Sequence, residues 1–395
     1  MRVAILGDTH IGAIFGLGSS KPEGGNTRVD DYKATLNYIV DYCIDSGIDL
    51  FIQTGDVFES RNPSPEHMSI FNDALRRLSL AGVAVAVIMG NHDYRRSGNT
   101  FTSAISSMAA VYYPNVKIAL EPEILELKKG GEHLQVVLIP YRDRKMYEGS
   151  TTEEDSLLYE QEVKELVSAC DPDSPIIAVG HNFFKENSYN DYGGLEVLPS
   201  FNAFDGCDMV TMGHYHGFKI LRKIKPIAIY AGSMEKSNFG DEKVKKYFVE
   251  YDTAKKKVKF IKTPVRELLN GTTDLSMYDT EHFWKALKDE FSKVDFKDKI
   301  VRYNIALQGK ILPTIKRTDI RDMLYDLGAY FVSKVTLEPI FNRMVRDSAV
   351  LEHKDDMSRT QAFIDSQPYD DELKAKLLKE AKLIVGTNDS TISET

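Results

Sequence analysis

A strand that ends abruptly in polar residues constrains the fold of this chain more than any other feature. Residues 83–88 are apolar, and Gly90-Asn91-His92-Asp93 follow almost directly. Gly90 allows a sharp turn where a side chain would clash. Polar groups after a buried strand stand where open α/β sheets place their chemistry. An amide and an imidazole suit a divalent metal and a proton donor. One tetrapeptide is a weak signal, so the rest of the chain must supply matching pieces.

Four other apolar strands are expected to end in the same way. They are strands 2–6 and 50–53, which run into Gly7-Asp8-Thr9-His10 and Gly55-Asp56, and strands 176–179 and 209–212, which run into Gly180-His181 and Gly213-His214-Tyr215-His216. Apolar residues at helical spacing over 30–45, and a helix start at Ser64-Pro65, complete a β-α-β-α-β order. This order is typical of parallel strands covered by helices. Further strands expected over 116–140 and 218–261 favour a second sheet packed on the first.

The polar residues after these strands have the composition of a two-metal site. Asp8 and His10 fall on one side of an extended segment, as do His214 and His216, because side chains alternate along a strand. A parallel sheet would bring all the pieces to one edge. Seven oxygen and nitrogen donors are then enough for two metals that share a carboxylate, and too many for one: Asp8, His10, Asp56, Asn91, His181, His214 and His216.

Each of these pieces alone has an ordinary structural explanation. A single histidine is usually structural, and a single Gly-Asp is usually a turn. Independent turns, however, would not each require a glycine and a hard ligand after every buried strand. The combination therefore indicates a metal site. The other histidines lack such a context and are assigned no role: His67, His133, His282 and His353.

The motifs together resemble the calcineurin-like metallophosphoesterases over about residues 1–265. Within that superfamily, Gly55-Asp56-Val57-Phe58 and Gly90-Asn91-His92-Asp93 resemble the SbcD family, the bacterial and phage counterparts of the eukaryotic double-strand-break repair nuclease. Residues 230–237, followed by Phe239-Gly240-Asp241, are similar to that family's late signature, with Ala231 where a proline is common. The protein Ser/Thr phosphatases would instead show Asp-Arg-Gly and Gly-Asn-His-Glu, and neither is present.

This resemblance implies an α/β fold of two packed β-sheets flanked by helices, and a role for each donor. Metal one is expected on Asp8, His10, Asp56 and His216, and metal two on Asp56, Asn91, His181 and His214, with Asp56 bridging. His92 is expected to be the catalytic residue that faces the scissile phosphate and helps the leaving group depart. Two Mn²⁺ ions are the family expectation, and Mg²⁺ or Fe²⁺ also suit ligands without sulfur. Asp93 is left without a firm role, since it could orient His92 or cap the next turn.

The rest of the chain is expected to serve the same activity. The pattern loosens around 264–279, so we predict a nuclease domain at 1–265, a small α+β capping domain at 266–345 and a helical segment at 346–395 with a disordered tail from Gly386. In the capping domain, Lys310, Lys316, Arg317 and Arg321 are candidate DNA contacts, and a solvated charged face is the alternative. The helical segment resembles the part by which the family binds its coiled-coil ATPase, SbcC, although it could also pack on its own protein.

Composition limits the setting in which such a protein works. The net charge of −9 argues against a wholly basic nucleic-acid binder but leaves room for local basic patches. The three cysteines, Cys43, Cys170 and Cys207, are far apart and odd in number, which fits a reducing compartment. No apolar run approaches the roughly 20 residues that span a membrane, and the start is too short for a signal peptide. We expect a cytoplasmic protein, or one of the host cytoplasm if a phage encodes it.

The predicted function is a two-metal, Mn²⁺-dependent DNA nuclease subunit. It is expected to act as a double-strand exonuclease and single-strand endonuclease on DNA ends, as a homodimer within a heterotetramer with an SbcC-type ATPase, in recombination, repair or replication. One alternative is a metallophosphoesterase that acts on a small nucleotide or a phosphoprotein. The other is a non-catalytic scaffold of the ATPase complex. The residues after the catalytic domain argue against the first alternative, and the complete ligand set with His92 argues against the second.

Overall fold

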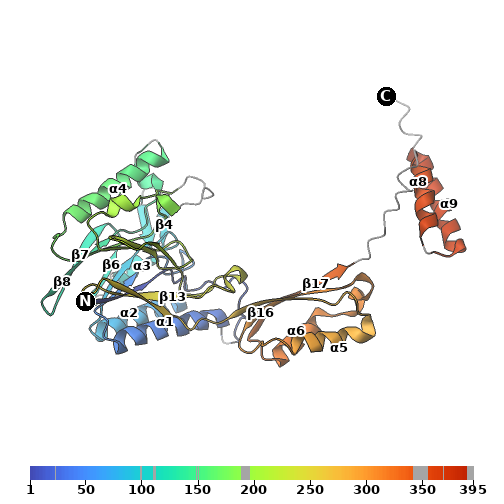
Figure 1. The fold of residues 1–395 in the computed structure, drawn as a ribbon, viewed down its shortest axis with the longest axis horizontal. Coiled ribbons are helices and arrows are strands. Elements are labelled where there is room, and N and C mark those ends of the chain that lie inside the picture. Colours follow the sequence, from blue (N-terminus) through green and yellow to red (C-terminus); the bar gives the residue numbers. More distant parts are fainter. Residues whose placement is uncertain are drawn as a thin grey trace. The chain divides into compact units, whose positions relative to one another are not determined.

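The computed structural model describes residues 1–22, 24–97, 100–109, 113–147, 149, 151–187, 196–340, 355–367 and 369–388. These residues form two six-stranded sheets, a three-stranded sheet, a two-stranded ribbon and their flanking helices (Figure 1). The chain divides into two compact units. The first comprises Met1–Thr273, Leu287–Ile305 and Ile315–Leu337, and the second comprises the rest of the described residues.

The first six-stranded sheet carries the strands that begin the chain. Its order is β14-β13-β1-β2-β3-β6, and β1, β2, β3 and β6 are parallel. At its other edge, β13 pairs antiparallel with β1, and β14 pairs antiparallel with β13. The bounds are β1 Arg2–Leu6, β2 Leu50–Gln53, β3 Ala84–Ile88, β6 Val116–Ala119, β13 Tyr247–Asp252 and β14 Lys257–Lys262.

The second six-stranded sheet has a parallel centre and antiparallel edges. Its order is β11-β12-β10-β9-β8-β7, with β8, β9, β10 and β12 parallel and with β7 and β11 antiparallel at the edges. The bounds are β7 Glu123–Lys129, β8 Glu132–Leu138, β9 Ile176–Gly180, β10 Met209–Met212, β11 Lys219–Arg222 and β12 Ile227–Tyr230.

Alternation along the central strands explains why the two sheets pack face to face between helices. In β1, Val3 and Ile5 join the core between the sheets, together with Ile177 and Val179 of β9. Ala4 and Leu6 point to the opposite face, because successive side chains alternate. That outer face is covered by α1 Thr27–Asp45 and α2 Pro65–Leu80, which lie side by side (Figure 1). The outer face of the second sheet is covered by α4 Thr152–Ser168.

The helix starts follow the expected local chemistry. The side chain of Asn26 caps α1 by accepting from the backbone N–H of Arg28, and Ser64 caps α2 by accepting from that of His67. Between β3 and β6 lie β4 Tyr94–Ser97, β5 Thr100–Ser103 and α3 Ala104–Ala109, which sequence patterns did not indicate. The described residues also contain five short 3-10 helices: η1 Arg144–Met146, η2 Lys185–Asn187, η3 Phe201–Phe204, η4 Phe239–Asp241 and η5 Gly309–Thr314.

The described residues after 264 form an α+β segment and two helices. The three-stranded sheet is β15 Leu268–Asp274, β16 Ile300–Gln308 and β17 Phe331–Ile340, accompanied by α5 Thr280–Phe291 and α6 Arg317–Asp326. The strand β15 occupies the region where the sequence pattern indicated only a loosening. The last helices are α8 Asp356–Ser366 and α9 Asp371–Asn388. The tail expected to be disordered from Gly386 is therefore helical to Asn388, and 389–395 lie outside the described residues.

Candidate metal centre

The predicted donors meet at the carboxyl ends of strands from both large sheets. Asp8 and His10 follow β1, Asp56 follows β2 and Asn91 follows β3, all in the first sheet. His181 follows β9, and both His214 and His216 follow β10, in the second sheet. The expectation that one parallel sheet would bring every piece to one edge is thus wrong. Each sheet contributes one set of strand ends, and packing of the sheets brings the two sets together.

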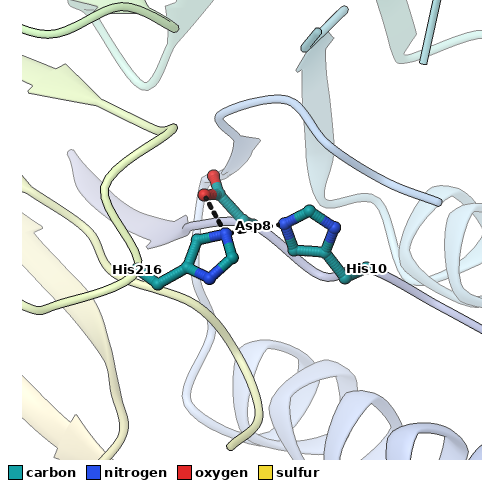
Figure 2. A group of neighbouring side chains, drawn as sticks. All are labelled: Asp8, His10 and His216. Atoms are coloured by element: carbon teal, nitrogen blue, oxygen red, sulfur yellow. Dashed lines mark hydrogen bonds and ion pairs between the residues drawn. The ribbon is translucent and has the colours of Figure 1, made fainter. Parts of the chain in front are cut away.

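One group of donors consists of Asp8, His10 and His216, whose side chains point toward one another (Figure 2). Nε2 of His10 and Nε2 of His216 are 2.9 Å apart. Nε2 of His216 is 3.7 Å from Oδ2 of Asp8, and Nε2 of His10 is 3.6 Å from Oδ2 of Asp56. Asp8 and His10 are buried, whereas His216 is partly exposed.

A second group consists of Asp56, His181 and His214, with Asn91 beside them. Oδ1 of Asn91 lies 3.0 Å from Nε2 of His181 and 2.9 Å from Nδ1 of His214. Nε2 of His181 is also 3.3 Å from Oδ2 of Asp56. Asp56 therefore contacts a histidine of each group, which is the place that a bridging carboxylate would occupy.

The donor atoms are arranged as they would be around cations. Oδ2 of Asp8 is buried and has no hydrogen-bond partner. Two imidazole nitrogens face each other in the first group, and two more converge on one amide oxygen in the second. Carboxylate, imidazole and amide donors without sulfur suit a hard or borderline divalent metal. These residues fit a divalent two-metal site of the predicted composition.

The charges in the site favour a cation as well. Burial alone would lower the pKa of His181, but the charges of Asp56 and Asp8 outweigh it and raise this pKa to about 10. His10 behaves in the same way. Its burial is outweighed by the contact with Glu59 and by the charges of Asp56 and Asp8, so its pKa is raised. The buried carboxylates therefore stabilise positive charge at both groups, and bound metal ions would supply that charge.

His92 lies beside the first group, and together with His10 and Glu59 it forms a third set of potential metal-binding side chains. Its ring centroid is 4.9 Å from that of His10, in an edge-to-face arrangement. Nδ1 of His92 lies 2.9 Å from the backbone carbonyl oxygen of Glu59, so this nitrogen is placed to donate a hydrogen bond. The ring is partly exposed, and Nε2 is the nitrogen that this contact leaves available for a substrate.

Asp93, for which the motif predicts no firm role, holds two loops of the site together. Its buried carboxylate accepts from the backbone N–H groups of Val57 at 3.0 Å, Phe58 at 3.2 Å and Gly90 at 2.9 Å. Neither alternative from the sequence is the observed one. Asp93 joins its own loop to the segment after Asp56, and so fixes two donor-bearing loops relative to each other.

Three candidate ligands occupy a backbone conformation that residues other than glycine rarely adopt. The φ angles are 43° at His10, 51° at Asp56 and 76° at His214. Each such residue costs about 1–3 kcal/mol and persists only where the surrounding structure requires it. Such strain gathers at functional sites, and here it coincides with the positions predicted from the motifs.

Two carboxylates of the site belong to none of the motifs that the sequence shows. Glu59 approaches His10, with Oε2 2.9 Å from Nδ1. Glu196 approaches His214, with Oε2 3.1 Å from Nε2. Glu59 could have been found, because it lies three residues after Asp56 in a donor-bearing loop. Glu196 lies in a long connection after β9 and carries no motif.

The candidate DNA-contacting residues lie away from these motifs in the chain, and all four are exposed. Lys316 precedes α6, and Arg317 and Arg321 are four residues apart on it, so these two share a helix face. Lys310 lies in η5, in the other compact unit. Their role in binding DNA stays a prediction.

A family model described as calcineurin-like phosphoesterase matches residues 1–218, more than half of the chain. The chain belongs to this family. The predicted superfamily and fold class are confirmed, and with them the class of enzyme, a phosphoesterase. The described helices include none that is long and apolar enough to cross a membrane.

Several named relatives share parts of this phosphoesterase. The SbcD component of the nuclease SbcCD of Bacillus subtilis is 25% identical over 251 residues, 59% of this chain and 61% of that protein. Exonuclease subunit 1 of enterobacteria phage T4 is 23% identical over 265 residues, 66% of this chain and 67% of that protein. The DNA double-strand break repair protein Mre11 of Methanosarcina mazei is 20% identical over 249 residues, 63% of this chain and 36% of that protein. The match thus spans less than two thirds of the bacterial and archaeal relatives.

Proposed function

We propose that this phosphoesterase is a metal-dependent DNA nuclease that hydrolyses phosphodiester bonds at DNA ends. Its activities would be those of a double-strand exonuclease and a single-strand endonuclease. The observation that carries the proposal is the convergence of seven candidate donors from five strand ends, with His92 beside them. The names of three relatives, all nucleases or break-repair proteins, favour DNA as the substrate.

The proposed ligand sets follow the two groups of donors. Metal one is held by Asp8, His10, Asp56 and His216, and metal two by Asp56, Asn91, His181 and His214. Mn²⁺ is the proposed ion, because mixed nitrogen and oxygen donors without thiolates suit it, with Mg²⁺ or Fe²⁺ as substitutes. When bound, such a pair of metals would lower the pKa of a water and stabilise the negative charge on the phosphoryl group under attack.

The chain itself supplies the proton for the leaving group. Hydrolysis adds a water oxygen to phosphorus and breaks the bond from phosphorus to the leaving sugar oxygen, which must take up a proton. His92 is placed to provide it through Nε2, because Nδ1 is held by the carbonyl of Glu59. This contact also restricts rotation of the ring and so preserves its orientation. His92 is therefore the proposed general acid.

The remaining segments are proposed to bring DNA and a partner to this site. Residues 1–265 would be the nuclease domain, 266–345 a capping domain whose exposed Lys310, Lys316, Arg317 and Arg321 contact DNA phosphates, and 346–395 the segment that binds an SbcC-type coiled-coil ATPase. Several large apolar side chains of the last two helices and their connection are partly exposed, which supports a binding role: Phe363, Tyr369, Leu373, Leu377 and Leu383. The part of this segment at 346–354 lies outside the described residues. A homodimer within a heterotetramer is the proposed assembly.

The proposal is tested by assaying the purified chain on end-labelled duplex and single-stranded DNA. Mn²⁺ is compared with Mg²⁺, with and without the ATPase and ATP, and His92→Gln serves as the control for contaminating nucleases. We expect Mn²⁺-dependent release of nucleotides from duplex ends and internal cleavage of single strands. Turnover of a small phosphodiester without DNA cleavage would favour a small-substrate phosphoesterase. Absence of both, in a chain that binds DNA and the ATPase, would favour a scaffold.

A further inference from the structure

Two acidic residues touch the candidate ligands without belonging to either proposed ligand set. Oε2 of Glu59 is 2.9 Å from Nδ1 of His10, and Oε2 of Glu196 is 3.1 Å from Nε2 of His214. Both are close charge contacts rather than hydrogen bonds, since Nδ1 of His10 and Oε2 of Glu196 have no hydrogen-bond partner. Both carboxylates are largely shielded from solvent, with side-chain exposures of 25% and 18%. One acidic residue thus accompanies each group of donors.

In both pairs the carboxylate contacts the ring nitrogen that faces away from the other donors. His10 directs Nε2 toward His216 and Nδ1 toward Glu59. His214 directs Nδ1 toward Asn91 and Nε2 toward Glu196. A neutral imidazole can bind a metal only through the nitrogen that carries no proton. The negative charge of a carboxylate beside one ring nitrogen favours a proton on that nitrogen, and so favours the tautomer whose free nitrogen faces the site.

His181 shows a related arrangement, in which a backbone carbonyl makes a hydrogen bond to the ring. Its Nδ1 lies 2.7 Å from the carbonyl oxygen of Thr54, while its Nε2 faces Asn91 and Asp56. Metal-binding histidines commonly donate their second ring N–H to a carboxylate or carbonyl, which fixes the ring and raises its basicity. Three of the four candidate histidine ligands therefore have an oxygen beside the ring nitrogen that faces away from the other donors. For His10 and His214 this oxygen belongs to a side chain, which can be changed by mutation.

We propose that Glu59 and Glu196 are positioning residues that act separately. Glu59 would fix His10 at metal one, and Glu196 would fix His214 at metal two. The inference rests on the proposed two-metal centre, and it adds that the two metal affinities can be weakened one at a time. Glu59 also holds His92 through its backbone carbonyl, a contact that side-chain substitutions keep.

The test measures Mn²⁺ binding to the full-length chain by calorimetry, with thermal unfolding as the check on folding. The variants are Glu59→Ala, Glu196→Ala and the matched control Glu165→Ala, whose side chain is exposed on α4. We expect each of the first two to weaken one of two binding events by about 10–100-fold and to leave the other unchanged. The control should bind both ions normally. Glu59→Gln and Glu196→Gln should restore only part of the lost affinity, because the amide keeps an oxygen beside the ring nitrogen but lacks the charge of the carboxylate.

Double substitutions assign each carboxylate to its metal. When His10→Ala has already removed metal one, adding Glu59→Ala should leave the affinity for the remaining ion unchanged. Adding Glu196→Ala should still weaken the binding of that ion. The reverse pattern is expected with His214→Ala. If the wild-type chain binds fewer than two Mn²⁺ ions, the proposed metal centre itself fails. If it binds two, and the alanine variants bind both as tightly or lose both together, the centre stands and the separate positioning roles are refuted.

Discussion

A Cβ atom on Gly90 would lie 2.2 Å from Oδ1 of Asp56, so the approach of these two residues requires glycine. The sequence explained Gly90 by a sharp turn, but its φ is not among the left-handed values. What glycine provides is space. It lets the loop after β3 close on Asp56, whose Oδ1 then accepts from the backbone N–H of His92 at 2.8 Å. The proposed bridging ligand and the proposed acid are thereby joined through one backbone contact.

Replacing Gly90 with alanine should therefore displace Asp56 and weaken the binding of both metals. We expect Gly90→Ala to reduce Mn²⁺ affinity by at least about tenfold, measured by calorimetry, because both proposed ligand sets include Asp56. Gly47→Ala is the control. Gly47 has a φ of 64° and nothing within 4 Å of its added Cβ, so this change strains the backbone after α1 without touching the site. It should lower the unfolding temperature yet bind Mn²⁺ normally.

His92 and Asp56 should separate metal binding from cleavage. His92→Gln is expected to bind two Mn²⁺ ions with unchanged affinity and to lose DNA cleavage by about 10²–10⁴-fold, the usual contribution of a positioned acid. Asp56→Asn is expected to lose metal binding and cleavage together, because a neutral amide cannot bridge two cations as a carboxylate does. Full cleavage by a metal-loaded His92→Gln chain would rule out the assigned role. Unchanged Mn²⁺ stoichiometry in Asp56→Asn would argue against the bridge.

Asp93 should matter for stability and, through it, for the site. In the wild type, the Asp93 carboxylate accepts hydrogen bonds from three backbone N–H groups. In Asp93→Asn the amide NH₂ must face at least one of these donors. A buried donor left without an acceptor costs about 1–3 kcal/mol, so urea denaturation should show a loss of this size. Asp173→Asn, at an exposed turn, serves as the control and should change stability little. A variant as stable as the wild type would show that the three contacts are dispensable.

The fold, and the clustering of the candidate donors, could be predicted because the decisive signals are local. A buried strand followed by glycine and a hard ligand is visible within a few residues, and it recurs five times. The pairing of strands into two sheets is not local. The sequences of β9 and β10 do not indicate that these strands join a different sheet from β1. The candidate metal centre nevertheless depends on having strand ends from both sheets. The edge strand β15 was missed because only Leu268 within it is fully buried, so its pattern is weak.

The site residues that escaped prediction are those whose position depends on other parts of the chain. Glu196 reaches His214 from a long connection, and no spacing rule links the two. Asp93 was visible within its motif, but its partners Val57 and Phe58 belong to another loop. Candidate ligands can thus be recognised at strand ends, whereas the groups that contact them become apparent only after the loops are placed.

Arg266 provides a test of how the α+β segment is held to the catalytic part within the first compact unit. Its guanidinium donates twice to Oδ1 of Asp31, at 2.9 and 2.8 Å, and once to the carbonyl of Asp298 at 3.0 Å. It also lies 3.4 Å from the ring centroid of Tyr330. Lysine can reproduce neither the paired donation nor the stacking. Arg266→Lys should therefore lose about 1–3 kcal/mol in urea denaturation. Arg76→Lys, which alters an exposed pair with Asp73, should stay within about 0.5 kcal/mol.

The acid stability of the chain should depend on Asp208. Burial would raise the pKa of this carboxyl, but contacts with Lys256 at 2.8 Å and with the backbone N–H of Ile176 at 3.2 Å, together with the charge of Lys225, lower it below its ordinary value. A carboxyl whose pKa is lowered by folding contributes its full stability above its unfolded pKa of about 3.9, and loses it as pH falls through the folded pKa.

Asp208→Asn should accordingly destabilise the chain at neutral pH and matter less in acid. We expect the difference in unfolding free energy between wild type and variant to be constant from pH 6 to pH 8. Below about pH 4 it should shrink, because the wild-type carboxyl then becomes protonated and resembles the amide. Urea denaturation at a series of pH values measures this difference. A difference that stays constant down to about pH 2 would show that packing around residue 208, rather than the charge of its carboxylate, provides the stability.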